Sequence, residues 1–420
     1  MSSRLIIADC TLVTPQGNKA KKGEEMGKLR VLDNAFVFIE DGIIKATGSM
    51  NDIDALALDG TAEWIDAAGR VVLPGFVDSH THLVFGGFRP DEFSWRLKGD
   101  SYMSIMERGG GIQSTVNATR ATESEVLERR AKWFLSRMSE MGVTTVEAKS
   151  GYGLDTSSEV KMLDVIGRLQ NDSDRKIDIV STFLGAHAVP KEYAGKTAEY
   201  CDLIISEMIP LVKDKAEFFD IFTEKNVFEL EDSRRLLEAA RKAGMKLKLH
   251  ADEIVQLGGA ELAAEMGAVS ADHLLHVSDE GIRSMAEAGV VATLLPLTAF
   301  ALKEPYAPAR KMIDGGCAVA LATDLNPGSC FSGSIPLTIA LACIYMGMSI
   351  EEVITALTLN GAAAVSRADS IGSVEAGKIA NLVMLEFDNY HMLPYYVGMN
   401  CVNTTIWHGK VVYKGFSLTI

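Results

Sequence analysis

Two histidines two residues apart, His80 and His82, follow an apolar run at residues 71–77. In an extended strand, residues i and i+2 point to the same side, so the two imidazoles can converge on one metal ion at the end of a strand. Imidazole nitrogen suits zinc, iron or nickel rather than magnesium or calcium. The alternative is a pair of surface histidines that bind nothing, and the rest of the chain has to decide between the two.

A catalytic metal needs about three to five ligands, with one position open for water. His250 and Asp324 are the best candidates to complete the set with His80 and His82. Asp324 precedes an Asn-Pro-Gly turn, and its alternative role is to initiate that turn. Cys330 is a conceivable ligand, but a lone buried thiol is usually a packing group.

Hydrolysis also needs a base that takes a proton from water and a donor for the leaving group. A metal would lower the pKa of its bound water toward neutrality and polarise a substrate carbonyl. Glu253, three residues after His250, and His273 are the candidates for the acid–base chemistry. The alternative roles are an exposed helix-start carboxylate for Glu253 and a buried histidine bonded to a carbonyl for His273.

Arg89 lies in a glycine-bearing loop shortly after His82. A guanidinium beside a metal suits bidentate binding of a carboxylate, although an isolated arginine is more often a surface ion-pair partner. Tyr152 and His187, in neighbouring loops, add hydrogen-bond donors. The glycines at 109–111 lack the lysine and hydroxyl residue of a phosphate loop, and we expect them to form a flexible lid.

These polar residues follow short runs of β-branched and apolar residues that alternate with helical segments. Three capping boxes predict helix starts: Thr122-x-x-Glu125, Thr156-x-x-Glu159 and Ser349-x-x-Glu352. The number of apolar runs is the number of strands that a (β/α)8 barrel requires: residues 73–80, 143–148, 177–184, 218–222, 245–250, 269–273, 290–295 and 318–323. Doubly wound sheets also alternate strands and helices. However, the candidate residues gather at the carboxyl ends of the runs, which is the active-site face of a barrel.

The two ends of the chain lack long helical patterns. Asp41-Gly42 and His408-Gly409, each between alternating runs, are signals for β-hairpins. We expect one small β-sandwich built from residues 1–70 and 366–420, beside a barrel of residues 71–365. The charged residues 16–29 are expected to form a solvated loop.

The chain has 420 residues and a formal net charge of −15, which argues against nucleic-acid and anionic-membrane partners because both require basic patches. Its six cysteines are far apart and include no Cys-x-x-Cys pair, a pattern typical of reduced thiols in the cytosol. The N-terminal segment has too short an apolar core for a signal peptide, and no uncharged apolar run reaches about 18 residues. We therefore expect a cytoplasmic protein.

The motif Pro74-Gly75-Phe76-Val77-Asp78-Ser79-His80-Thr81-His82 resembles the first-strand motif of the amidohydrolase superfamily. Longer segments are similar to the imidazolonepropionase family of that superfamily, which opens a ring in histidine degradation: residues 80–89, 102–106, 109–112, 147–154, 185–190, 250–253, 270–273 and 323–329. The resemblance implies a (β/α)8 TIM barrel with a composite β-sandwich. It also implies hydrolysis of 4-imidazolone-5-propanoate to N-formimidoyl-L-glutamate in L-histidine degradation.

The resemblance further implies a role for each candidate residue. One zinc or iron ion would be held by His80, His82, His250 and Asp324. The substrate's propionate and ring would be bound by Arg89, Tyr152 and His187, with further contacts from Glu253 and Ser329, while the opened product would meet Asn326 and Gly328. Catalysis would involve Glu253, His273 and Asp324. Because Lys149 follows the second strand and not the fourth, we expect no carboxylated lysine bridging two metals.

Two other functions are compatible with the sequence. A deaminase or hydrolase of another small nitrogen heterocycle would share the metal ligands, but a neutral nucleobase has no carboxylate for Arg89. A non-catalytic metal-binding or scaffold barrel would lack a ligand or a base, and none is missing. Imidazole and carboxylate accept zinc, iron or manganese, so these residues do not identify the metal. We expect a small anionic heterocyclic substrate and a homodimer.

Overall fold

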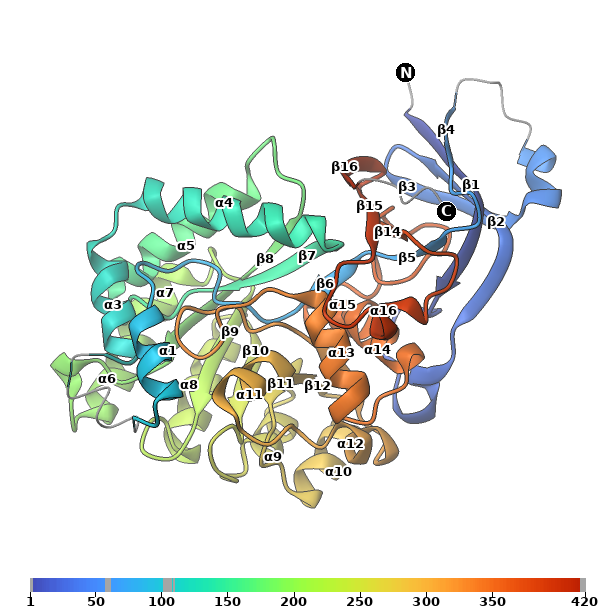
Figure 1. The fold of residues 1–420 in the computed structure, drawn as a ribbon. Coiled ribbons are helices and arrows are strands. Elements are labelled where there is room, and N and C mark those ends of the chain that lie inside the picture. Colours follow the sequence, from blue (N-terminus) through green and yellow to red (C-terminus); the bar gives the residue numbers. More distant parts are fainter. Residues whose placement is uncertain (1–2, 57–61, 101–107, 109, 416–420) are drawn as a thin grey trace.

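The computed structural model describes residues 3–56, 62–100, 108 and 110–415. Two sheets form its framework (Figure 1). One is a barrel of eight parallel strands surrounded by helices, and the other is a separate sheet made from both ends of the chain. The predicted fold class, a (β/α)8 barrel with a small β-sandwich domain from both termini, is confirmed in the barrel and in a separate sheet built from both termini.

The barrel strands follow one another in chain order, and each is parallel to the next. They are β6 (Phe76–Asp78), β7 (Val143–Lys149), β8 (Asp178–Ala186), β9 (Phe218–Thr223), β10 (Lys246–Ala251), β11 (Ser270–His273), β12 (Val291–Leu294) and β13 (Ala318–Leu321). Each of the eight predicted runs therefore contributes a strand to the barrel.

The barrel closes between its last and first strands, at the predicted metal-binding motifs. The amide of Asp324 donates a hydrogen bond to the carbonyl of His80 at 3.0 Å, and the amide of His82 donates to the carbonyl of Leu325 at 2.9 Å. The carboxylate of Asp78 accepts two more hydrogen bonds from the residue before Asp324. Closure of the barrel therefore brings together ligand candidates that are far apart in the sequence.

Helices cover the outside of the barrel. Ser349 caps α14 in a capping box with Glu352, as predicted. The other two predicted boxes are wrong: Glu123 precedes α4 without a side-chain cap, and Asp155 caps α5 by accepting from the amide of Ser158. The α-helices are α1 (Pro90–Leu97), α3 (Ile112–Ala121), α4 (Ser124–Glu140), α5 (Thr156–Gln170), α6 (Thr197–Leu203), α7 (Ile209–Val212), α8 (Leu230–Lys242), α9 (Gly259–Glu265), α10 (Asp279–Ala288), α11 (Pro296–Leu302), α12 (Ala309–Asp314), α13 (Ile335–Tyr345), α14 (Ile350–Leu357), α15 (Leu359–Ala364) and α16 (Met392–Tyr395). The 3-10 helices are η1 (Gly23–Gly27), η2 (Met50–Leu56) and η3 (Lys191–Tyr193), and η4 (Ile204–Met208) is a π-helix.

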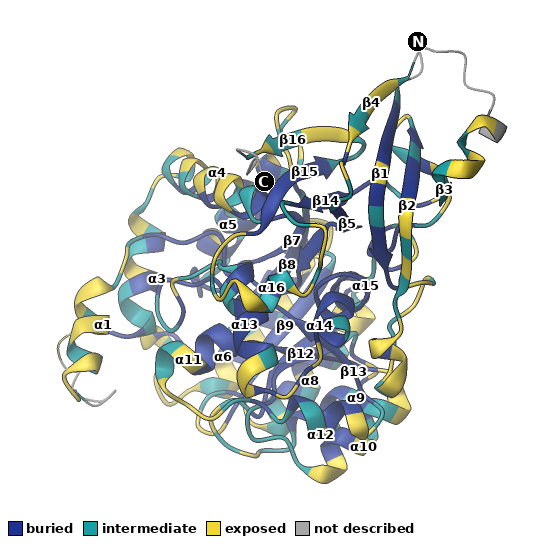
Figure 2. Ribbon diagram, turned by 45° about the vertical axis from the view of Figure 1, so that its right-hand side comes forward, coloured by how far each residue is buried: buried dark blue, intermediate teal, exposed yellow. Residues whose placement is uncertain are grey.

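The second sheet joins strands from both chain ends in the order β16-β15-β14-β5-β1-β2-β3, with β4 beside β1. Its strands are β1 (Arg4–Thr14), β2 (Arg30–Glu40), β3 (Ile43–Ser49), β4 (Glu63–Asp66), β5 (Val71–Pro74), β14 (Leu382–Leu385), β15 (Val402–Trp407) and β16 (Lys410–Lys414). Strands β1 and β14 are buried along most of their length (Figure 2). Both predicted hairpins are confirmed: Asp41-Gly42 and His408-Gly409 have positive φ angles between paired strands.

The apolar run at 73–80, predicted as one strand, is divided between the two sheets at Gly75. Strand β5 pairs with β1 and β14, whereas β6 begins the barrel. Gly75 leaves no room for a side chain, because a Cβ there would lie 2.3 Å from Oγ1 of Thr144. An apolar run has the same pattern whether it pairs within one sheet or two, so the sequence does not reveal the division.

Residues 16–29 are mostly exposed, as their charge predicts, but they include the short helix η1 and one buried residue. Met26, in η1, is fully buried against α14. Its carbonyl accepts a hydrogen bond from Oγ1 of Thr355 at 2.7 Å. One apolar residue in a charged segment thus anchors the segment to the outside of the barrel.

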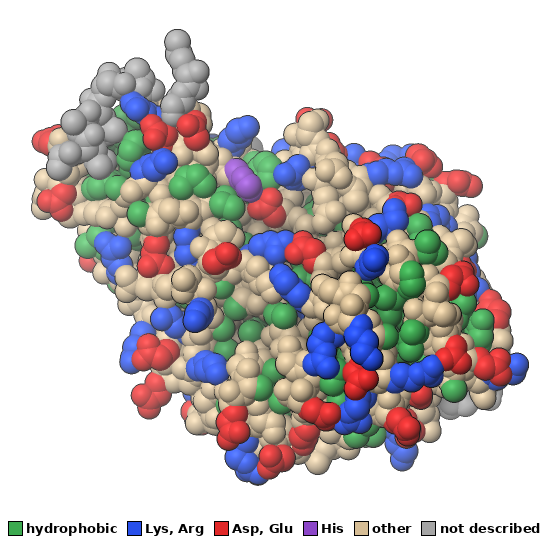
Figure 3. All heavy atoms as spheres, turned by 180° about the vertical axis from the view of Figure 1, so that it is seen from behind, with side chains coloured by type: hydrophobic (Ala, Val, Ile, Leu, Met, Phe, Trp, Pro, Cys, Tyr) green, Lys and Arg blue, Asp and Glu red, His purple; other side chains and the backbone are tan. Residues whose placement is uncertain are grey.

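The charged surface is mixed in sign. On the face opposite to that of Figure 1, acidic and basic side chains are interspersed (Figure 3). In the part of the chain that the structure describes, no helix is long and apolar enough to cross a membrane.

Candidate active site

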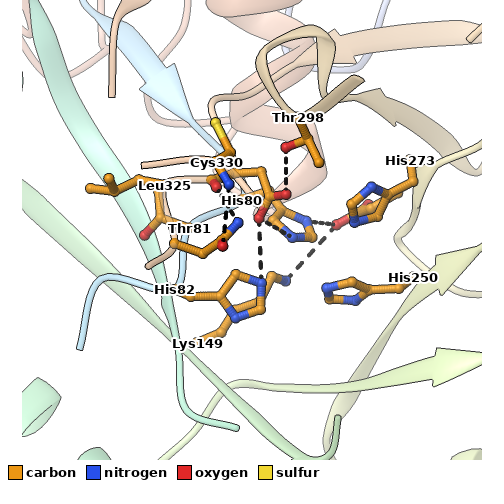
Figure 4. A network of polar contacts seen from close by, with 12 residues as sticks. His80, Thr81, His82, Lys149, His250, His273, Thr298, Leu325 and Cys330 are labelled. Atoms are coloured by element: carbon orange, nitrogen blue, oxygen red, sulfur yellow. Dashed lines mark hydrogen bonds and ion pairs between the residues drawn. The ribbon is translucent and has the colours of Figure 1, made fainter. Parts of the chain in front are cut away.

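The four predicted metal ligands converge at the carboxyl end of the barrel. His80 and His82 follow β6, His250 belongs to β10 and Asp324 follows β13, and all four are buried. Oδ1 of Asp324 lies 3.6 Å from Nε2 of His80 and 3.5 Å from Nε2 of His82. The ring centroids of His80 and His250 are 4.6 Å apart. Figure 4 shows the three histidines around a common space.

The free polar atoms of this cluster fit a bound metal ion. Nε2 of His80, Nε2 of His250 and Oδ1 of Asp324 are buried and have no hydrogen-bond partner among the described residues. Unpartnered buried polar atoms are costly, so their convergence fits a cation that they would share. Two ligand atoms about 2.1 Å from one ion at a tetrahedral angle are about 3.4 Å apart, close to the separations around Asp324.

Two more histidines border the same space. Three groups of ligand atoms, each with members within 4.8 Å of one another, overlap there: His80, His250 and His273; His82, His187 and His250; and His80, His82 and Asp324. The structure therefore surrounds one space with five histidines and one aspartate. Each of the four predicted ligands belongs to at least one of these groups.

Hydrogen bonds with neighbouring side chains orient two of the ligand candidates. Nδ1 of His80 is hydrogen-bonded to Oδ2 of Asp272 at 2.6 Å, which leaves Nε2 directed at the common space. Oδ2 of Asp324 accepts a hydrogen bond from Oγ1 of Thr298 at 2.6 Å, which leaves Oδ1 free. Such partners fix the tautomer and the orientation of metal-binding side chains.

Burial keeps most of these imidazoles in the neutral form that binds metals. It holds the pKa values of His80, His82 and His273 well below the ordinary histidine value. Burial also acts on His250, but Asp220 outweighs it and raises the pKa of His250. Protons therefore compete with a metal more strongly at His250 than at the other imidazoles.

No role in the site was predicted for the charged side chains that lie inside the barrel beneath the histidines. They are Glu147, Lys149, Asp220, Lys248 and Asp272, all of them buried. The sequence does contain a signal for buried charged groups. A charged residue inside an apolar strand, such as Asp220 in Phe-Phe-Asp-Ile-Phe, needs a partner. Which partner it has depends on neighbouring strands, and the sequence does not show that.

A fourth group with metal-ligand spacing lies within this layer, formed by His80, Glu147 and Asp272. Lys149 is 2.8 Å from Glu147, and Lys248 is 3.4 Å from it. Two ammonium groups thus already supply positive charge to these carboxylates. The metal is expected above this layer, among the histidines.

The predicted acid–base pair lies beside the ligands. Nε2 of His273 is 3.5 Å from Oε2 of Glu253. Burial, reinforced by the charge of Asp324, raises the pKa of Glu253 to about 8. His273 has a φ of 75°, which is uncommon for a residue other than glycine. Because side chains alternate along a strand, this turn is what allows both His273 and the preceding Asp272 to face the site.

Tyr152 and His187, predicted to bind the substrate, lie next to His82. Their ring centroids are 5.6 Å and 4.9 Å from that of His82. Nδ1 of His187 is 3.0 Å from the carbonyl of Gly151, so it carries the proton and leaves Nε2 as an acceptor. Glu159, predicted as part of a capping box, instead accepts hydrogen bonds from three backbone amides of the Tyr152 loop.

Arg89 packs on the loop that follows Asp324. A Cβ on Gly328 would lie 1.3 Å from Nη2 of Arg89, so the guanidinium rests directly on this glycine. The side chain of Arg89 is 11% exposed, and its Nη1 is 3.4 Å from Oε2 of Glu92. In the described part of the chain Glu92 is the one carboxylate paired with Arg89, so the other N–H groups of the guanidinium can meet an incoming anion.

Asn326 shapes the same loop. Its Oδ1 accepts hydrogen bonds from the amides of Gly328 and Ser329, both at 2.8 Å, and its Nδ2 donates to the carbonyl of Asp324. The contacts of these residues with substrate or product stay predictions. Cys330 is buried with its Sγ 3.4 Å from a backbone carbonyl, as a packing role requires. Gly109, which is part of the predicted lid, lies outside the described residues. The segment 102–106, which resembles the family, also lies outside them.

Fold and site together define a metal-dependent hydrolase of the amidohydrolase type. The amidohydrolase family matches residues 71–412. The imidazolonepropionase of Bacteroides thetaiotaomicron is 64% identical over 416 residues, which cover 98% of this chain and 99% of that protein. The imidazolonepropionase of Clostridium tetani is 58% identical over 406 residues, 96% of each chain. The chain therefore belongs to the amidohydrolase family and, within it, to the imidazolonepropionases.

Solved structures share the fold at low sequence identity. Guanine deaminase of E. coli has a TM-score of 0.72 and 14% identity, with 99% of this chain and 100% of that chain covered. A 5-methylcytosine deaminase from Klebsiella pneumoniae has a TM-score of 0.75 and 19% identity, with 99% and 98% covered. At these identities the likeness shows the fold alone.

Proposed function

We propose that the protein hydrolyses 4-imidazolone-5-propanoate to N-formimidoyl-L-glutamate in L-histidine degradation. The observation that carries this proposal is a buried histidine–aspartate centre with Arg89 packed on the loop that follows Asp324. The substrate combines a cyclic amide with a propionate, and the site offers a partner for each. Water adds to the ring carbonyl, the ring C–N bond breaks, and the departing nitrogen takes a proton.

His80, His82, His250 and Asp324 would hold one zinc or iron ion. Such an ion supplies Lewis acidity toward a carbonyl and lowers the pKa of a water that it holds. Three imidazoles and one carboxylate accept zinc, iron or manganese, so the donor set does not choose among them.

The remaining residues bind the substrate and move protons. Glu253 and His273, 3.5 Å apart, would divide the work of deprotonating the attacking water and bonding to the ring or its carbonyl. Tyr152 and His187 would contact the ring. Arg89, held by Gly328, would bind the propionate through a charge-assisted pair.

Arg89→Ala should chiefly weaken the binding of the substrate. Losing a charge-assisted pair in a desolvated pocket costs about 2–4 kcal/mol, or roughly 30- to 900-fold in kcat/KM. Steady-state kinetics with 4-imidazolone-5-propanoate and with an imidazolone that lacks the carboxylate measure the effect. The variant should lose the preference for the anionic compound while its metal content stays unchanged.

Two further variants control this experiment. Gly328→Ala should reproduce much of the loss, because the added Cβ would occupy the place of the guanidinium. Arg130→Ala, which removes an arginine that packs on Phe88, should leave kcat/KM unchanged. An Arg89→Ala enzyme with wild-type kcat/KM on the natural substrate would show that the propionate binds elsewhere.

We also propose that the protein acts as a homodimer in the cytoplasm. The cysteines are all free, as in a reducing compartment. Helices α13 and α16 pack together, and large apolar side chains are exposed at the end of α13 and in or just after α16: Ile344, Tyr345, Tyr395, Val397 and Met399. A second copy would cover these side chains by presenting the same face.

Tyr395→Glu should therefore convert the dimer to a monomer at micromolar concentration, because it places a charge on a side chain that is 80% exposed. Sedimentation velocity measures the change. Trp64→Glu, at a similarly apolar residue on β4, is the control and should stay dimeric. A wild-type protein that sediments as a monomer would contradict the proposal.

A further inference from the structure

A buried layer of charged side chains lies inside the barrel directly beneath the predicted metal ligands. It contains three carboxylates and two ammonium groups, all 0% exposed: Glu147, Asp220, Asp272, Lys149 and Lys248. They come from β7, β9, β10 and β11, which also carry His250 and His273. Buried charges are costly unless each is well paired, so this layer is expected to serve the site above it.

Lys149 lies at the centre of the layer and contacts all three carboxylates. Its Nζ donates a hydrogen bond to Oδ2 of Asp220 at 2.7 Å. The same Nζ is 2.8 Å from Oε2 of Glu147 and 3.9 Å from Oδ2 of Asp272. One ammonium group therefore bridges carboxylates from three different strands.

In two of these carboxylates, the oxygen atom that contacts Lys149 also contacts a predicted metal ligand. Oδ2 of Asp220 lies 3.1 Å from Nδ1 of His250. Oδ2 of Asp272 is hydrogen-bonded to Nδ1 of His80 at 2.6 Å. With each Nδ1 turned toward a carboxylate, the Nε2 atoms of both imidazoles are left for the common space above.

We propose that Lys149 is a positioning residue for the metal centre, which holds Asp220 and Asp272 where they orient His250 and His80. The inference rests on the proposed metal site. Without the ammonium group, the two carboxylates repel each other across a medium of low dielectric, and the imidazoles lose their fixed orientation.

Lys248 provides a matched control within the same layer. It is as buried as Lys149, and its Nζ is 3.4 Å from Glu147 and 3.7 Å from Asp272. In the described part of the chain no ion pair joins it to Asp220; it donates instead to the backbone carbonyl of Ser79. It therefore contacts only one of the two orienting carboxylates.

The test compares Lys149→Met with Lys248→Met in the full-length protein, since methionine replaces most of the stem and removes the charge. The dissociation constant of Zn2+ is measured by competition with a chelator, and the visible spectrum of the Co2+ form reports the ligand geometry. Lys149→Met should bind Zn2+ about 10–100-fold more weakly and give an altered spectrum. Lys248→Met should lose less affinity, and both proteins should retain the circular dichroism of the wild type.

A double variant separates bridging from charge balance. The layer of the wild type contains three carboxylates and two ammonium groups. The double variant Lys149→Met/Glu147→Gln keeps two carboxylates and one ammonium group, so the layer has a formal net charge of −1 in both proteins. The double variant should still bind Zn2+ weakly, and it carries the test if Lys149→Met does not fold. Wild-type affinity in Lys149→Met or in the double variant would overturn the inference, as would an equal loss in Lys248→Met. A wild-type protein without metal would instead overturn the proposed site.

Discussion

His250→Ala is expected to remove the metal and the hydrolytic activity together. His250 lies in β10, and its Nε2 is buried without a hydrogen-bond partner in the described residues. The histidine groups that surround the common space share His250 with both His80 and His82. Metal content should fall from about one ion per chain to near zero. Activity should fall at least about 10³-fold, because Lewis-acid assistance is worth several kcal/mol.

The measurements are elemental analysis of the purified protein and steady-state kinetics, with circular dichroism to show that the barrel is intact. His276→Ala is the matched control, because His276 belongs to none of the groups with metal-ligand spacing in the described chain. It should keep both metal and activity. Full metal content in His250→Ala would place the ion elsewhere and remove the basis of the proposed mechanism.

The sequence predicted the barrel because most of its strands combine an apolar run with a polar residue at or just after the carboxyl end. His80, His82, His250 and Asp324 come from three places in the chain, and they meet because parallel strands place their carboxyl ends at one face. Local signals were less reliable. Glu159 has the spacing of a capping box, but its carboxylate accepts from amides of the preceding Tyr152 loop and Asp155 caps the helix instead.

Contacts between strands could not be predicted from the sequence. Lys149 and Asp220 are far apart in the chain, yet Nζ and Oδ2 are 2.7 Å apart in the barrel interior. The position of His273 depends on a left-handed φ of 75°, which no residue pattern indicates. The division of the first apolar run at Gly75 likewise follows from Thr144 of a neighbouring strand. Periodicity reports which residues are buried, but not which of them meet.

Glu253→Gln and His273→Ala are each expected to lower kcat by about 10²–10⁴-fold while the metal content stays near one ion per chain. Opening a cyclic amide requires a proton to leave water and another to reach the departing nitrogen. Glu253 and His273 are 3.5 Å apart beside the ligands, so they are placed to share these transfers. Loss of metal in His273→Ala would make His273 a ligand, since it also belongs to a group with His80 and His250.

The pH dependence of kcat/KM separates Glu253 from the other groups. Burial, and next the charge of Asp324, raise the pKa of Glu253 to about 8, so below that pH the carboxyl group holds a proton and cannot act as a base. The rate should therefore rise with pH through the pKa of Glu253. A cation bound beside Asp324 would offset the negative charge of Asp324 and lower the pKa of Glu253, so the rate would then rise at a lower pH. Glu253→Gln should lose this rise, because glutamine does not titrate. A rise that persists unchanged in Glu253→Gln would assign the base to another group and leave His273 and Asp324 as the candidates.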